Sequence, residues 1–175
     1  AAIVAAEHIG ITPAESIEAL AAFQGVRRRL EVRGTVGGVT VIDDFAHHPT
    51  AIATTIAGLR ARMQAGSHPG GRLLAVLEPR SNTMRTGTLK AQLPASLKDA
   101  DLVFCYAGGI DWDAQAALAP LGERVAVLRD MPTLEAAILA AARPGDQVLV
   151  MSNGGFGGIH GRLLTGLASR EGNGK

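Results

Sequence analysis

Three segments of this chain combine polar, charged and glycine residues, and each directly follows an apolar stretch. They are residues 43–50 (DDFAHHPT), 78–85 (EPRSNTMR) and 152–160 (SNGGFGGIH). The carboxylates of Asp43 and Asp44 could accept hydrogen bonds from ribose hydroxyls or hold a cation. The arginines of the second segment could fork onto a carboxylate or a phosphate. The glycines of the third suggest a close approach of backbone to a ligand.

Each segment also has a plainer interpretation. Asp43, Asp44 and His48 could merely cap a turn and the helix that follows, and residues 78–85 could be a solvated loop. Tight turns that need a positive φ explain one or two glycines, but hardly four in the five residues 154–158. The third segment is not the dinucleotide fingerprint G-x-G-x-x-G, because His160 stands where the last glycine should fall.

A fourth feature is the run Arg27-Arg28-Arg29. Three adjacent arginines cannot all face the same way, so at most some of them can contact one ligand. A solvated linker and a phosphate-binding site explain the spacing equally well. The sequence does not reveal which of the three would face a phosphate.

Several motifs are absent, and their absence limits the function. The chain has no G-x-x-x-x-G-K-[ST] phosphate loop and no G-x-S-x-G elbow, so we expect no ATP hydrolysis by this chain alone. A net charge of +1 gives no support to nucleic-acid binding. No apolar run approaches the roughly 20 residues that span a bilayer. The single cysteine, Cys105, excludes a disulfide framework and is compatible with a cytoplasmic location.

The hydrophobic pattern predicts the elements that must position these segments. We expect a β-hairpin over residues 30–42, later strands at 73–77, 102–106, 125–128 and 147–151, and helices at 49–63, 89–97, 112–118, 132–142 and 159–169. Strands that are apolar throughout and alternate with helices indicate an open, mostly parallel, doubly wound (Rossmann-like) α/β sheet. Ligands bind such sheets at the carboxyl ends of the strands, which is where all three segments fall.

Residues 1–24 are predicted to form two short helices. Thr12 can cap the second helix, Pro13 suits its first position, and Glu15 can complete a capping box. At the other end, residues 169–175 are expected to form a flexible tail.

Read together, the motifs resemble the Mur ligase family. Residues 23–31 (FQGVRRRLE) and 43–49 (DDFAHHP) are similar to the hinge and strand-end motifs of its C-terminal domain. Residues 77–84 and 151–160 resemble murein peptide ligases in particular. The resemblance covers about residues 1–168. It implies that residues 1–24 end the central ATPase domain, that 25–168 form the C-terminal domain, and that 169–175 are a tail.

The resemblance implies an ADP-forming ligase that attaches the recycled murein tripeptide L-Ala-γ-D-Glu-meso-diaminopimelate to UDP-N-acetylmuramate. Arg29 would be catalytic and reach the ATP γ-phosphate, Asp44 would bind ribose, and Phe45, where an alanine-adding relative has Tyr, would pack beside the nucleotide. Mg²⁺ ligands and the UDP-sugar site would lie in domains outside this chain. The tripeptide pocket would be lined by His47, Arg80, Ser152, Asn153, Gly155, Gly157 and His160.

Two other functions remain open at this stage. One is another amide ligase of the same superfamily, such as the alanine-adding ligase or folylpolyglutamate synthase, against which only the motifs at 78–84 and 152–160 argue. The other is a non-catalytic Rossmann-like binding module.

Overall fold

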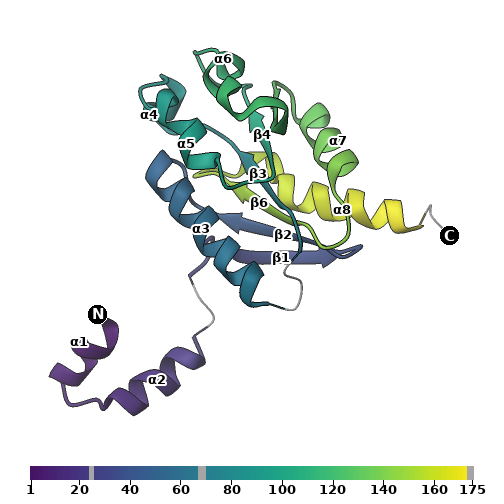
Figure 1. Ribbon diagram of the computed structural model, residues 1–175. Coiled ribbons are helices and arrows are strands. Elements are labelled where there is room, and N and C mark those ends of the chain that lie inside the picture. The colour runs from purple at the N-terminus through teal and green to yellow at the C-terminus, as the bar shows by residue number, and fades with distance from the viewer. Residues whose placement is uncertain (24–25, 67–69, 173–175) are drawn as a thin grey trace.

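The computed structural model describes residues 1–23, 26–66 and 70–172 (Figure 1). Within them, six strands form one sheet in the order β1-β2-β6-β3-β4-β5. β1 is antiparallel to β2, and every other neighbouring pair is parallel, so the predicted open α/β sheet with its hairpin is confirmed. The strands are β1 (Glu31–Val36), β2 (Val39–Asp44), β3 (Leu73–Leu77), β4 (Leu102–Tyr106), β5 (Val125–Leu128) and β6 (Gln147–Met151).

Helices cover both faces of the sheet (Figure 1). One face carries α3 (Pro49–Ala65), α5 (Leu93–Leu97) and α6 (Ala114–Leu118), together with the short elements α4 (Asn82–Arg85), η1 (Lys90–Gln92) and η2 (Ala119–Arg124). The other face carries α7 (Met131–Ala141), η3 (Phe156–Gly158) and α8 (Ile159–Gly172). Two hydrophobic layers therefore hold the sheet between them, which explains why β3 and β6 are apolar on both sides.

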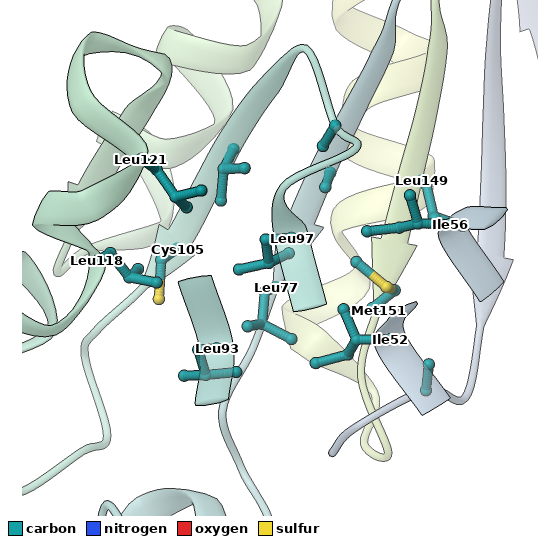
Figure 2. Close-up of a cluster of buried hydrophobic side chains, with 14 of the residues drawn as sticks. Ile52, Ile56, Leu77, Leu93, Leu97, Cys105, Leu118, Leu121, Leu149 and Met151 are labelled. Carbon is teal, nitrogen blue, oxygen red and sulfur yellow. The ribbon is translucent and has the colours of Figure 1, made fainter. Parts of the chain in front are cut away.

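The core is aliphatic. Figure 2 shows the first layer, in which Ile52 and Ile56 of α3 and Leu93 and Leu97 of α5 pack on the sheet. Cys105 of β4 lies in the same layer, and burial raises the pKa of its thiol to about 12. A thiol that stays protonated in this way is a packing residue and not a nucleophile.

Several elements differ from the sequence prediction, among them the helix expected at 89–97, which is the turn η1 followed by α5. Residues 82–85 form one turn of helix, α4, inside the segment that the pattern indicated as a polar loop. Met84 explains it, because this side chain is buried and the Trp112 indole Nε1 donates to the Met84 carbonyl over 2.7 Å. The last helix, predicted to end at residue 169, continues to Gly172.

The first two helices are α1 (Ala2–His8) and α2 (Pro13–Ala21), and they contact each other. The predicted capping box at Thr12 and Glu15 is present in α2. α1 buries none of its residues. The assignment of residues 1–24 to a preceding domain stays a prediction. None of the helices in the described ranges is both long and apolar enough to cross a membrane.

An arginine–aspartate pair closes the amino end of the sheet. Arg72, just before β3, donates from both Nε and an Nη to the Asp146 carboxylate, over 3.0 and 2.6 Å. The same guanidinium donates to the Ala141 carbonyl, and the Arg143 amide donates to Asp146. Its hydrogen bond to Asp146 raises the pKa of Arg72. The buried carboxylate is therefore fully paired inside the fold.

Candidate functional site

The three polar segments meet at the carboxyl end of the sheet. Asp44 at the end of β2 and Leu77 at the end of β3 both pair with Met151 of β6. Beyond the strands, the Glu78 amide donates to the Met151 carbonyl, and the Ser152 amide donates to the Asp44 carbonyl. Because β6 lies between β2 and β3, segments more than a hundred residues apart in the chain form one edge, as the sequence predicted.

The arginine run joins this edge through Arg28. Its Nε donates to the Asp43 carboxylate at 3.2 Å, and one Nη donates to the carbonyls of Ser152 and Gly154, the latter at 2.9 Å. The guanidinium carbon lies 5.1 Å from the centre of the Phe45 ring, a cation–π contact. Arg29, which the family resemblance marks as catalytic, is exposed at the surface.

Asp44 is 2% exposed and holds the local backbone together. One carboxylate oxygen accepts from the Leu30 amide at 2.9 Å; the other accepts from the Ala46 amide at 2.8 Å and the Thr55 hydroxyl at 3.2 Å. The plainer interpretation of Asp44 is confirmed for the turn, through the Ala46 amide, and wrong for the helix, because neither amide belongs to α3. Binding of ribose by Asp44 stays a prediction, and it requires this carboxylate to share or give up one of these bonds.

The start of the glycine segment is tied to the second polar segment. The Ser152 hydroxyl donates to the Glu78 carboxylate, and the Gly154 amide donates to the Ser152 oxygen at 2.9 Å. A Cβ at Gly154 would fall on the Arg80 guanidinium, so only glycine fits there without displacing that arginine. Gly157 has a φ of +56°, which favours glycine, whereas Gly155 has an ordinary φ of −79° and open space around it.

A cleft of about 310 Å³ opens beside these residues. It holds two guanidinium groups and one carboxylate, which suits a ligand that carries both carboxylate and ammonium groups. Arg85 is fixed at its rim, because its Nε donates to the Gly109 carbonyl at 3.1 Å. The cleft is lined by Glu78, Pro79, Arg80, Arg85, Tyr106, Gly108 and Gly109.

The residues predicted to bind peptide are not all at this cleft. Arg80 lines it, and Ser152 bonds to Glu78 at its wall. His47 lies elsewhere, with its Nδ1 2.9 Å from the Phe45 carbonyl. The side chain of His160, 13% exposed, has its Nε2 3.3 Å from the Asp43 carboxylate. The structure therefore brings Arg80 and Ser152 together, and it places His160 beside Asp43 and His47 beside Phe45.

Electrostatics around His160 favour its neutral form. Burial lowers the pKa of His160, the Asp43 charge opposes that shift, and the charges of Arg33 and Arg28 add to it. At the glycine segment, the buried Asn153 Oδ1 makes no hydrogen bond to any described residue.

Sequence reasoning missed the roles of Arg28 and Gly154 and the wall formed by Tyr106, Gly108 and Gly109. The wall had a usable signal, since Gly108 and Gly109 follow the apolar strand β4 just as the other segments follow theirs. At Gly108 a Cβ would meet the Tyr106 ring and the Arg129 carbonyl, so this turn also needs glycine.

At this edge of the α/β sheet, arginines, carboxylates and a glycine segment lie together. Residues 28–154 match the family described as Mur ligase, glutamate ligase domain. The chain belongs to this family, and the resemblance found in its motifs is confirmed.

Individual relatives narrow the comparison. The chain is 48% identical over 170 residues to the UDP-N-acetylmuramate–L-alanyl-γ-D-glutamyl-meso-2,6-diaminoheptanedioate ligase of Escherichia coli K12, covering 97% of this chain and 36% of that enzyme. A crystallised domain described as part of such a ligase from Haemophilus ducreyi is 46% identical, with a TM-score of 0.68, covering 80% of this chain and 100% of that domain. The murein peptide ligase of Psychrobacter arcticus is 39% identical, with a TM-score of 0.72, covering 95% of this chain and 35% of that structure. This chain thus spans about a third of the length of the full-length relatives.

Proposed function

We propose that this chain is the acceptor-binding part of an ATP-dependent ligase of peptidoglycan recycling. The longer enzyme would join L-Ala-γ-D-Glu-meso-diaminopimelate to UDP-N-acetylmuramate in the cytoplasm. The E. coli relative is named for that pair of substrates, which supports the proposal. The observation that carries it is the cleft with two arginines and one glutamate at the carboxyl end of β3.

The tripeptide fits the chemistry of this cleft. It carries several carboxylates, which Arg80 and Arg85 would bind through planar forks, and a free ammonium that the Glu78 carboxylate would attract. Ser152, Asn153 and the amides of the glycine segment would add donors and acceptors at the wall that the peptide backbone passes. His47 and His160 would then support residues of the site, at Phe45 and Asp43, and would not contact the peptide directly.

ATP would meet the chain at Arg29, the last residue of the arginine run. Mur ligases are ATP-dependent. Arg29 would extend toward the γ-phosphate, Asp44 would contact ribose, and Phe45 would pack beside the nucleotide. The Mg²⁺ ligands and the UDP-sugar site are proposed to lie in parts of the enzyme outside this chain. We therefore expect the chain by itself to turn over no ATP.

The test is ADP release by the full-length enzyme with each substrate varied in turn. The tripeptide should support turnover far better than L-alanine, and Arg80→Lys should weaken tripeptide use while the KM for ATP stays nearly constant. Lysine keeps the positive charge but loses the planar fork. An enzyme that prefers L-alanine, or an Arg80→Lys variant with unchanged tripeptide kinetics, would contradict the proposal.

A further inference from the structure

Arg28 belongs to the arginine run, where ATP is proposed to bind, and its side chain contacts the glycine segment, which borders the proposed peptide site. We propose that Arg28 is a positioning residue that locks the glycine segment to the arginine run, so that the peptide site and Arg29 are presented together. This inference rests on the proposed function, in which the glycine segment borders the peptide site and Arg29 faces phosphate.

The first argument is the distribution of the Arg28 contacts. Its guanidinium donates to the Asp43 carboxylate of β2 and to the carbonyls of Ser152 and Gly154 beyond β6. It also lies against the Phe45 ring. A planar group with donors on several edges can hold these partners at once, which a lysine ammonium on a flexible stem cannot do in the same geometry.

The second argument is the backbone that surrounds Arg29. Arg28 and Leu30 have φ angles of +57° and +47°, which residues other than glycine rarely adopt. Hydrogen bonds fix both positions: the Arg28 amide donates to Glu31, the Phe45 amide donates to the Arg28 carbonyl, and the Leu30 amide donates to Asp44. The backbone of Arg28 and Leu30 therefore determines the direction of the Arg29 side chain. Of these two neighbours, Arg28 is the one that is bonded to the glycine segment.

The third argument concerns what holds the glycine segment. Among the described residues, nothing forms a hydrogen bond with the buried Asn153 Oδ1, whereas His160 Nε2 lies 3.3 Å from the Asp43 carboxylate. The segment is held by the buried Phe156 side chain, by the Ser152 hydroxyl, which donates to Glu78, and by the two carbonyls that accept from Arg28. Losing Arg28 should consequently loosen the segment that carries Gly154, and Gly154 packs on Arg80 in the cleft.

Kinetics of the full-length enzyme provide the main test. Arg28→Ala should raise the tripeptide KM and lower kcat, each by roughly tenfold, because both presented groups lose their common anchor. Arg28→Lys should recover part of both losses and also serves if the alanine variant does not fold. Arg27→Ala is the matched control, since Arg27 is exposed and adjacent, and it should change both constants by less than about twofold.

A double variant separates positioning from general damage. If Arg28 acts on kcat through Arg29, then Arg28→Ala made in an Arg29→Ala enzyme should lower kcat no further, yet it should still raise the tripeptide KM. An equal loss of kcat from Arg28→Ala in both backgrounds would overturn the proposal. So would a lower melting temperature with unchanged kinetic constants.

Amide hydrogen exchange gives a readout that does not depend on the identity of the acceptor. Arg28→Ala should speed amide exchange over residues 152–158. It should leave residues 146–150, which include most of β6, nearly as protected as before. Unchanged exchange over 152–158 would overturn the positioning role even in an enzyme that uses the tripeptide. A wild-type enzyme that ignores the tripeptide would instead overturn the proposed function, so the two failures are distinguishable.

Discussion

The two ends of the sheet carry the same kind of charge pair in different settings. Arg72 and Asp146 lie at the amino end, Arg28 and Asp43 at the carboxyl end, and in both pairs the aspartate is buried while the arginine side chain is 29% exposed. Arg72 donates twice to one carboxylate and once to a single carbonyl, that of Ala141. Arg28 divides its donors between a carboxylate and two carbonyls of another segment.

Burial alone therefore does not tell a structural ion pair from one that serves a site. The Arg72 fork closes on groups that belong to the fold, and its bonds would be the same with or without a ligand. The Arg28 contacts reach a glycine segment at the edge where open α/β sheets bind ligands. We conclude that loss of the Arg72–Asp146 pair should lower the stability of the fold. Loss of the Arg28–Asp43 pair should instead change the catalytic rate and the affinity for substrate.

The largest expected effect is on the rate, at Arg29. In the full-length enzyme, Arg29→Ala should lower kcat by about 10²–10³, or roughly 2.7–4 kcal/mol, because a charge-assisted contact to a transferring phosphoryl group would be lost. Arg27→Ala is the control, and substrate KM values should move much less than kcat. Equal losses at Arg27 and Arg29 would mean that the run acts only as a hinge.

At the amino end the effect should appear as stability. Arg72→Ala leaves the buried Asp146 carboxylate with the Arg143 amide as its donor, and we expect it to lower the free energy of unfolding by roughly 2–4 kcal/mol. Urea unfolding of this chain measures the change. Kinetic constants of the folded enzyme should stay close to those of the wild type. If Arg28→Ala proves just as destabilising as Arg72→Ala, the contrast between the two pairs fails.

A smaller change should follow from the glycine that packs on Arg80. Gly154→Ala places a Cβ on the Arg80 guanidinium and should push it out of the cleft. Losing one charge-assisted hydrogen bond corresponds to a rise of about tenfold or somewhat more in the tripeptide KM. Gly155→Ala is the comparison, because its Cβ meets open space, and it should have the smaller effect. Similar KM values for the two variants would separate Gly154 from the peptide site.

The fold was largely predictable because the strands are apolar on both faces. The predicted bounds of β3, β4, β5 and β6 match the structure, since unbroken apolar runs between helices have one good interpretation. The short helix α4 was not predictable, because it depends on burial of Met84 beneath a distant tryptophan. The residues around Met84 do not indicate a contact with a residue as far along the chain as Trp112.

The site was predictable in location but not in detail. Strand ends indicated where polar segments converge, and the register confirms that they do. Which arginine enters the site could not be read, because the left-handed backbone at Arg28 and Leu30 turns adjacent side chains in ways no periodicity describes. For the same reason the hydrogen bonds that Asp44 accepts from Leu30 and Thr55 could not be predicted, whereas its bond to the Ala46 amide fits the predicted turn.

The smallest expected effect is a pH dependence at the carboxyl end. Burial is the largest influence and lowers the pKa of His160; the charge of Asp43 raises it, and the charges of Arg33 and Arg28 lower it further. Near its pKa of about 6.5, the histidine of the unfolded chain binds a proton that His160 of the folded chain does not bind. The contribution of neutral His160 to stability is therefore complete above that pH and is lost as the pH falls below it.

His160→Gln should therefore weaken the fall in unfolding free energy between about pH 7.5 and pH 5.5. His8→Gln in α1 is the matched control, because that histidine is exposed, and it should leave the slope unchanged. Urea unfolding of the three proteins at both pH values measures the difference. If Asp43 instead controlled His160, the pKa would be raised and protonation would stabilise the fold, so removing the histidine would steepen the fall. The sign of the change thus decides whether burial or the charge of Asp43 controls the pKa of His160 at this end of the sheet.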